Sequence, residues 1–232
     1  MAGFKGSITV VLVHGAWADG SSWNDIIGPL LSKGRNVLAA PIPLTSLSDD
    51  AAALDRALEH THGPVVLVAH AYAGAVIAAN TSERVQSLVF IAALAPDGGE
   101  TVAEVFYRGK PHPQAPQLEP DPHGLIGMPQ EGFATAFSQR ACPERAALLA
   151  ATQRPIAVAY IQERAPRPAW KVKPSWYLVA EEDRMISPVT QRFMAQRMGA
   201  RIRSEKVDHM PLVTAPEPVI EVILEAAASS AA

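Results

Sequence analysis

VVLVAHAYAG, residues 65–74, is the stretch of sequence that decides the fold. Residues 65–69 are a continuous apolar run without polar alternation, which is typical of a strand buried on both faces. Residues 72–80 continue as a predicted helix. Small residues, Ala69 and Ala73, flank the centre of the junction, so that strand and helix can pack closely. The stretch therefore predicts a strand, a tight turn and a helix in immediate succession.

The same alternation extends in both directions from this unit. Short apolar runs predict further strands at residues 8–13, 36–40, 85–92, 175–180 and 201–207. Apolar residues at helical spacing predict helices at residues 22–34, 47–60, 188–198 and 217–228. Strands and helices that alternate in this way predict an α/β fold with a mostly parallel, doubly wound sheet and helices on both faces.

The middle of the chain interrupts this alternation. Residues 96–129 are dense in Pro, Gly and His and contain no comparable strand, and helices are predicted only at 131–140 and 143–152. We expect one domain over residues 1–232, with a core of about 6–95 and 173–232 and a cap insertion of about 96–172. Such a cap commonly walls a substrate pocket.

Composition narrows the classes of partner. The chain has 232 residues, 48% of them hydrophobic, which is enough for one core, and its formal charge of -3 is evenly spread. We therefore expect a small-molecule partner and no binding to nucleic acid or to a membrane. The apolar runs are far shorter than the roughly 18 residues of a membrane span. The sequence does not determine the oligomeric state and is compatible with a homodimer.

Cysteine and histidine usage carries two further expectations. Cys142 is the only cysteine, so no internal disulfide can form, and no signal-peptide pattern opens the chain. Both observations favour the cytoplasm. His112 and His123 are isolated and proline-flanked, unlike metal ligands, so we expect no metal and no cofactor.

Three segments follow predicted strands at the sheet edge where open α/β sheets place their active sites. The first is the turn within residues 69–74. In the nucleophile elbow G-x-S-x-G, the reactive serine stands at the centre of a strained turn between small residues. Here Ala71 occupies the position of the serine, and Ala69 and Ala73 replace the glycines. The sequence has the elbow and lacks the nucleophile.

The other two segments offer a base and an acid. His209 lies after the last predicted strand and just before the C-terminal helix, where the chain order Ser, Asp, His places the general base. Glu181, Glu182 and Asp183 follow the penultimate strand, and a buried carboxylate there can orient the imidazole. Position alone leaves open a surface histidine and a solvated acidic turn.

Five segments together resemble one group of α/β-hydrolases, which includes plant methylesterases, hydroxynitrile lyases and bacterial esterase-like relatives. The segments are His14-Gly15-Ala16-Trp17 with Gly20 and Trp23, the elbow around Ala71, residues 183–188, Asp208-His209-Met210, and residues 169–176. The resemblance covers nearly the whole chain and implies the α/β-hydrolase fold with an inserted cap.

Carried over residue by residue, the resemblance implies that His209 is the general base and that Asp183, rather than either glutamate, orients it. Asp208 is then a bystander. The backbone N–H groups of Ala16 and Tyr72 are implied to form the oxyanion hole.

The resemblance also assigns supporting roles to other residues. It implies that His14 and His70 are scaffold, held by hydrogen bonds within their loops. Trp17, Tyr72 and Met210 are expected to line the substrate pocket, although each also fits an ordinary core position.

Two positions separate esterases from lyases in this group. The lyases carry Thr in the first loop and Lys directly after the catalytic histidine, whereas this chain has Gly15 and Met210. The expected function is therefore that of a carboxylic-ester hydrolase acting on a small-molecule ester.

Ala71 makes the chain inactive as a serine hydrolase, because a methyl group has no lone pair to attack a carbonyl. One explanation is an introduced serine-to-alanine substitution, which the otherwise hydrolase-like sequence favours. The alternatives are a naturally serine-less protein that uses the His209–Asp183 dyad for proton abstraction, as a lyase, cyclase or cofactor-free oxygenase, and a non-catalytic receptor for a small ligand. The fold does not decide among them.

Overall fold

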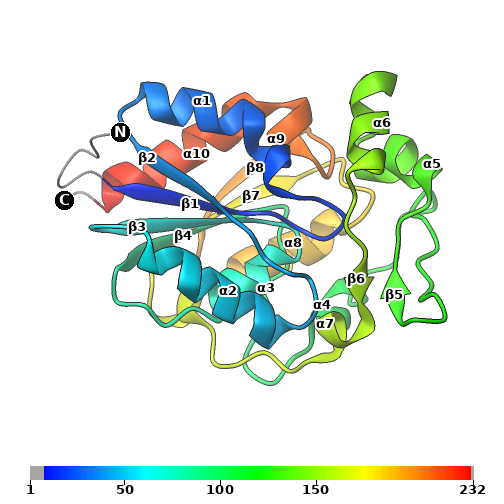
Figure 1. Ribbon diagram of the computed structural model, residues 1–232, viewed down its shortest axis with the longest axis horizontal. Coiled ribbons are helices and arrows are strands. Elements are labelled where there is room, and N and C mark those ends of the chain that lie inside the picture. Colours follow the sequence, from blue (N-terminus) through cyan, green and yellow to red (C-terminus); the bar gives the residue numbers. More distant parts are fainter. Residues whose placement is uncertain (1–7, 231–232) are drawn as a thin grey trace.

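The structure, a computed structural model, describes residues 8–230 of the chain (Figure 1). Its main sheet has the strand order β2-β1-β3-β4-β7-β8, and every neighbouring pair in it is parallel. The strands are β1 (Thr9–Val13), β2 (Asn36–Ala40), β3 (Val65–His70), β4 (Val85–Ile91), β7 (Ser175–Ala180) and β8 (Arg201–Glu205). The central strands are buried and apolar, whereas the edge strands β2 and β8 are partly exposed. This arrangement confirms the predicted parallel sheet.

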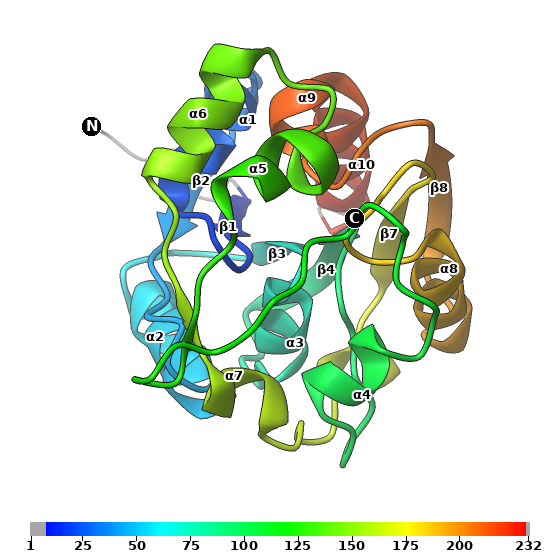
Figure 2. The same cartoon turned by 90° about the vertical axis from the view of Figure 1, so that its right-hand side faces the viewer.

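Helices cover both faces of the sheet, as predicted for a doubly wound fold (Figures 1 and 2). On one face lie α1 (Asn24–Ser32) and α10 (Pro216–Ser229), which pack against each other. On the other face lie α2 (Leu47–Glu59), α3 (Ala73–Ala78) and α8 (Pro188–Arg197). No helix within residues 8–230 is long and apolar enough to cross a membrane.

Most of the segment between β4 and β7 lies beyond the carboxyl ends of the strands, and the part after residue 162 returns past α3 to the start of β7 (Figure 1). Its elements are α4 (Val102–Phe106), β5 (Leu125–Ile126), α5 (Gln130–Gly132), the π-helix η2 (Phe133–Phe137), α6 (Pro143–Ala151), β6 (Ile156–Ala157), α7 (Val158–Gln162) and the 3-10 helix η3 (Ala169–Lys171). Strands β5 and β6 pair antiparallel, apart from the main sheet. The short helix α9 (Pro211–Thr214) follows β8.

This segment differs from the sequence prediction in two ways. The helix expected at 131–140 is a single α-helical turn that continues as a π-helix and ends at Phe137, where the Ser138 N–H donates to the Phe133 carbonyl. Elements of two to five residues, such as β5 and α7, were not predicted because they are too short to show a helical or an alternating pattern. The expected start of the core at residue 6 lies outside the described residues.

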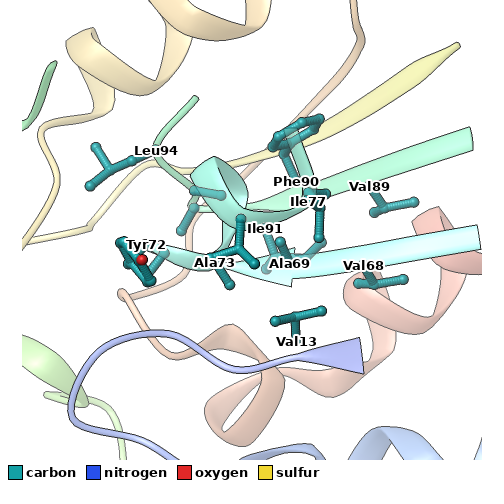
Figure 3. Packing of buried hydrophobic residues seen from close by; sticks show 14 of the residues in the cluster. Val13, Val68, Ala69, Tyr72, Ala73, Ile77, Val89, Phe90, Ile91 and Leu94 are labelled. Atoms are coloured by element: carbon teal, nitrogen blue, oxygen red, sulfur yellow. The ribbon is translucent and has the colours of Figure 1, made fainter. Parts of the chain in front are cut away.

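Close packing at the carboxyl end of β3 depends on small residues (Figure 3). Ala69 and Ala73 are fully buried and lie among the valines and isoleucines of the sheet. Gly74 follows at the start of α3, where an added Cβ would lie 2.3 Å from the Leu94 carbonyl oxygen. Helix α3 therefore packs directly on the backbone that follows β4.

Gly74→Ala is expected to destabilise the protein by at least about 1 to 3 kcal/mol, because the methyl group can fit only if the backbone moves. The control is Gly127→Ala, since an added Cβ there meets only a Gln153 side-chain atom at 3.9 Å. Denaturant unfolding of the two variants measures the difference. Equal stability of both would contradict the tight packing of α3 on residue 94.

Candidate active site

The elbow predicted at residues 69–73 is present at the end of β3. Ala71 has φ +51°, a left-handed conformation that costs energy for any residue with a side chain. Its N–H donates to the Ile91 carbonyl at 3.2 Å, and its carbonyl accepts from the Leu94 N–H at 2.8 Å. The backbone after β4 therefore holds Ala71 in this conformation.

Strain of the same kind recurs along this edge of the sheet. Within the described residues, the other non-glycine residues with positive φ are Trp17, Leu44 and Ala92, and each follows a strand, namely β1, β2 or β4. Backbone strain of this kind clusters at functional sites, where the surrounding structure maintains it. The carboxyl edge of the sheet is therefore the candidate position of the active site.

His209 and Asp183 form a buried pair at this edge. The Nδ1 atom of His209 lies 2.7 Å from Oδ2 of Asp183, and both side chains are at most 2% exposed. An ionised carboxylate only accepts hydrogen bonds, so Nδ1 carries a proton, and in the neutral imidazole Nε2 keeps its lone pair. Nε2 has no hydrogen-bond partner within residues 8–230, and the ring lines the same cavity as Ala71.

Three further donors fix the Asp183 carboxylate. The Met185 and Ile186 N–H groups donate to Oδ1 at 2.7 and 2.9 Å, and the Gln191 amide donates to Oδ2 at 2.8 Å. These three hydrogen bonds hold the carboxylate in the orientation in which it contacts the His209 imidazole.

The two neighbouring glutamates lie elsewhere. Glu181 forms an ion pair with Arg192, and Glu182 forms one with Arg140. Of the three consecutive carboxylates, the structure brings only Asp183 to His209.

His70 also contacts the general base. Its Nε2–H donates to the His209 carbonyl at 2.7 Å, and the two rings lie 4.8 Å apart. Burial, together with the neighbouring His209, lowers the pKa of His70 well below its usual value, so this imidazole is neutral. The bonds expected within the loop of His70 are therefore replaced by a bond to the loop of the general base. His14 does bond locally, to the Gly15 carbonyl.

Tyr72 is anchored by a carboxylate that sequence analysis missed. Its hydroxyl donates to Asp50 Oδ2 at 2.8 Å, and the Leu44 N–H donates to Oδ1 at 2.7 Å. The Tyr72 ring stacks on Tyr160 of α7, with 3.4 Å between ring centroids. Burial raises the pKa of Asp50 to about 6. The signal was available, because Asp50 falls on the buried stripe of helix α2 at helical spacing from Leu47.

Asp50→Asn is expected to change how stability depends on pH. The folded protein holds the Asp50 proton up to about pH 6, whereas the unfolded chain loses it near pH 4. The contribution of Asp50 to stability therefore falls as pH rises through this window, by about 3 kcal/mol for a pKa difference of about 2. Asparagine does not titrate, so the unfolding free energy of the variant minus that of the parent should rise between pH 4 and 7. A constant difference would contradict a raised pKa.

The backbone N–H groups of Ala16 and Tyr72 have no hydrogen-bond partner within the described residues. Both residues line the cavity. Unpaired N–H groups beside an elbow residue are the feature that an oxyanion hole needs.

A cavity of about 250 Å³ opens on Ala71 and His209. Its lining is mostly apolar and includes Val102, Phe106, Ile126, Ile156, Tyr160 and Met185. Among residues 8–230, no Asp, Glu, Lys or Arg lines the cavity, and neither does any Ser, Thr or Cys. A bound molecule would therefore meet a mostly apolar wall, the His209 imidazole and a few uncharged polar side chains, Gln162 and Tyr160 among them.

Of the three residues expected to line the pocket, two do so and Met210 does not. Trp17 and Tyr72 line the cavity, and the Trp17 indole N–H donates to the Ile126 carbonyl, which ties the first loop to β5. Met210 is fully buried, does not line the cavity, and precedes helix α9. Within residues 8–230 no cluster of three or more His, Cys, Asp or Glu side chains is arranged to hold a metal ion.

Solved structures with this fold include several esterases. An esterase of polyneuridine aldehyde is 18% identical, with 94% of this chain and 98% of that chain covered and a TM-score of 0.77. A pyrethroid hydrolase from Sphingobium faniae JZ-2 is 19% identical, with 96% and 98% covered and a TM-score of 0.82. A methylesterase from Arabidopsis is 18% identical, with 96% and 99% covered and a TM-score of 0.77.

At these identities the similarity shows the fold, and no curated protein sequence matches the chain. The alpha/beta hydrolase family matches residues 10–222, which is most of the chain. The chain therefore belongs to the alpha/beta hydrolase family.

Proposed function

We propose that this protein is a carboxylic-ester hydrolase in which alanine stands at the position of the nucleophilic serine. The observation that carries the proposal is the shared cavity of Ala71 and His209, with the imidazole oriented by Asp183 at 2.7 Å. A base with a free Nε2 beside an elbow residue at positive φ is the arrangement that activates a serine hydroxyl.

With serine at position 71, each group has one task. The serine oxygen attacks the ester carbonyl while His209 Nε2 takes the hydroxyl proton. The Ala16 and Tyr72 N–H groups stabilise the oxyanion of the tetrahedral intermediate. His209 returns the proton to the leaving alcohol, which leaves an acyl-enzyme. Water then attacks this ester by the same route, releases the acid and restores the serine.

With alanine at position 71, the chain should bind the ester without cleaving it. The cavity lining offers no other hydroxyl or thiol of Ser, Thr or Cys to replace the missing nucleophile. We propose that Ala71 is an introduced substitution, because the base, the acid and the two free N–H groups all remain in place for a serine.

The substrate we propose is a neutral, apolar ester small enough for a cavity of about 250 Å³. We also propose that residues 96–172 act as a cap, since most of the apolar lining comes from this segment. A charge in this cavity would be desolvated with no partner, which is costly. Methyl benzoate is therefore expected to bind about 100-fold more tightly than the carboxylate-bearing monomethyl terephthalate. Calorimetric titration of the chain as given measures both; equal affinities would contradict an uncharged cavity.

A second function is supported by one observation. Nε2 of His209 is free and faces the cavity without a serine in the way, so the dyad can take a proton from a bound substrate while the two N–H groups stabilise the anion that forms. This is the chemistry of a lyase, a cyclase or a cofactor-free oxygenase. A receptor that uses the same cavity only to bind is the non-catalytic counterpart.

One experiment separates these functions. The protein with Ala71 is incubated with neutral aryl and methyl esters. Calorimetry measures binding of the ester, and chromatography measures product. Saturable binding with intact ester recovered agrees with a disabled esterase. Turnover that His209→Ala abolishes would instead support the dyad enzyme. A receptor would bind but gain no hydrolysis when serine is introduced at position 71.

A further inference from the structure

The segment between β4 and β7 contacts both loops that carry the acid and the base. The Arg140 N–H donates to Asp208 Oδ2 at 3.0 Å, beside His209. The Arg140 guanidinium bonds to the Glu182 carboxylate at 2.6 and 3.0 Å, beside Asp183. One short stretch of chain therefore spans the two catalytic loops.

Two more hydrogen bonds reinforce this bridge. The Gln139 amide donates to the Glu182 carbonyl at 2.8 Å, and Arg184 donates to the Thr135 carbonyl at 2.7 Å. Residues 133–140, which comprise the π-helix η2 and the turn that follows it, are called the strap below.

Asp208 is the buried anchor of the strap. It is fully buried and accepts from the Met210 N–H and the Thr214 hydroxyl as well as from Arg140. As expected for a bystander, Asp208 does not bond to the His209 imidazole. Its contacts instead fix the backbone on both sides of His209.

The strap also touches the imidazole itself. Phe137, the last residue of η2, is fully buried, and its ring lies 5.2 Å from the His209 ring at an angle of 55°. The same ring contacts Trp17 of the first loop edge-on at 6.4 Å. A π-helical turn displaces a side chain from its α-helical position, and such turns occur frequently at functional sites.

We infer that Phe137 is a positioning residue for the general base: its ring, which the strap holds in place, aligns His209 with Asp183. The Asp183 bond fixes Nδ1 but leaves the ring free to tilt about the line that joins the two atoms. A ring packed against the imidazole limits this tilt and keeps Nε2 directed at residue 71. Misplacement of a catalytic group by about 1 Å costs up to about 100-fold in rate.

The test compares Phe137→Leu with Phe133→Leu. Both residues are fully buried in η2, and their rings contact each other at 5.1 Å, but Phe133 has no recorded ring contact with His209. Both variants should lose similar stability on thermal unfolding. Should Phe137→Leu fail to fold, Phe137→Met takes its place, because its longer, unbranched side chain adapts to the same space without a ring.

The first readout needs no esterase activity. In the chain as given, nitrogen-15 NMR follows the tautomer of His209 and the exchange of its Nδ1 proton with water. Phe137→Leu should accelerate this exchange about tenfold, while Phe133→Leu should leave it near the parent value. Equal changes in both variants, or none in either, would overturn the inference.

The second readout rests on the proposed function. In the Ala71→Ser variant, Phe137→Leu is expected to lower kcat about 10- to 100-fold with KM nearly unchanged, and Phe133→Leu far less. If Ala71→Ser alone produces no hydrolysis, the proposed function fails while the NMR comparison still decides the role of Phe137.

Discussion

Ala71→Ser is expected to raise kcat for a neutral aryl ester by about 10⁶, from a trace rate to that of a working hydrolase. Loss of a triad serine costs about this factor in serine hydrolases, and what remains comes from binding and the oxyanion hole. The cavity, the His209–Asp183 pair and the N–H groups of Ala16 and Tyr72 are already in place, so only the nucleophile is missing.

Release of p-nitrophenol from p-nitrophenyl butyrate measures this gain. The control is Ala75→Ser, which adds the same hydroxyl to a buried site in α3 that does not line the cavity. The Ala75→Ser variant should hydrolyse the ester only at the trace rate of the parent protein. Equal activity of the two serine variants, or of neither, would count against residue 71 as the nucleophile position.

In the Ala71→Ser variant, His209→Ala is expected to remove about 10⁶ of kcat and Asp183→Asn about 10⁴. The histidine takes the serine proton, so its loss should cost about as much as loss of the serine. Asparagine at position 183 can donate to Nδ1 and so favours the tautomer with the proton on Nε2, where it blocks the base.

The combination of both changes should cost little more than His209→Ala alone, because the two residues act as a unit. Steady-state kinetics of the single and combined variants, with KM determined for each, check this. Effects that multiply, or an Asp183→Asn variant with full activity, would contradict the proposed pair. Glu181→Gln is the matched control, since this carboxylate bonds to Arg192 and should leave kcat unchanged.

The parts of the fold that sequence predicted are those with strong local signals. Buried parallel strands such as β3 and β4 are uninterrupted apolar runs, and helices such as α2 have a clear apolar stripe. The elbow was recognisable because a strand can turn directly into a helix only through small residues such as Ala69 and Ala73. Chain order pointed to His209 and to the acidic run 181–183, the family resemblance selected Asp183 from that run, and the structure places the two residues in contact.

Other features depend on contacts between distant residues. The Phe137 contact with His209 joins residues 72 positions apart and depends on a π-helical turn that has no periodic signature. Met210 was expected in the pocket, with a core position as the alternative, and the structure buries it just before α9, outside the cavity lining. Asp50, in contrast, lies on the apolar stripe of α2, so its burial was predictable from helical spacing alone. The cytoplasmic location and a homodimer stay predictions.

Covalent labelling with a fluorophosphonate tests most directly the claim that residue 71 is the nucleophile position served by His209 and Asp183. An activated serine displaces fluoride from phosphorus, and intact-mass spectrometry with peptide mapping records the adduct and its place. We expect one adduct on residue 71 in the Ala71→Ser variant, none on the chain as given, and greatly slowed labelling when His209→Ala is added. Labelling of the chain as given at the same rate, or none in the Ala71→Ser variant, would contradict the account.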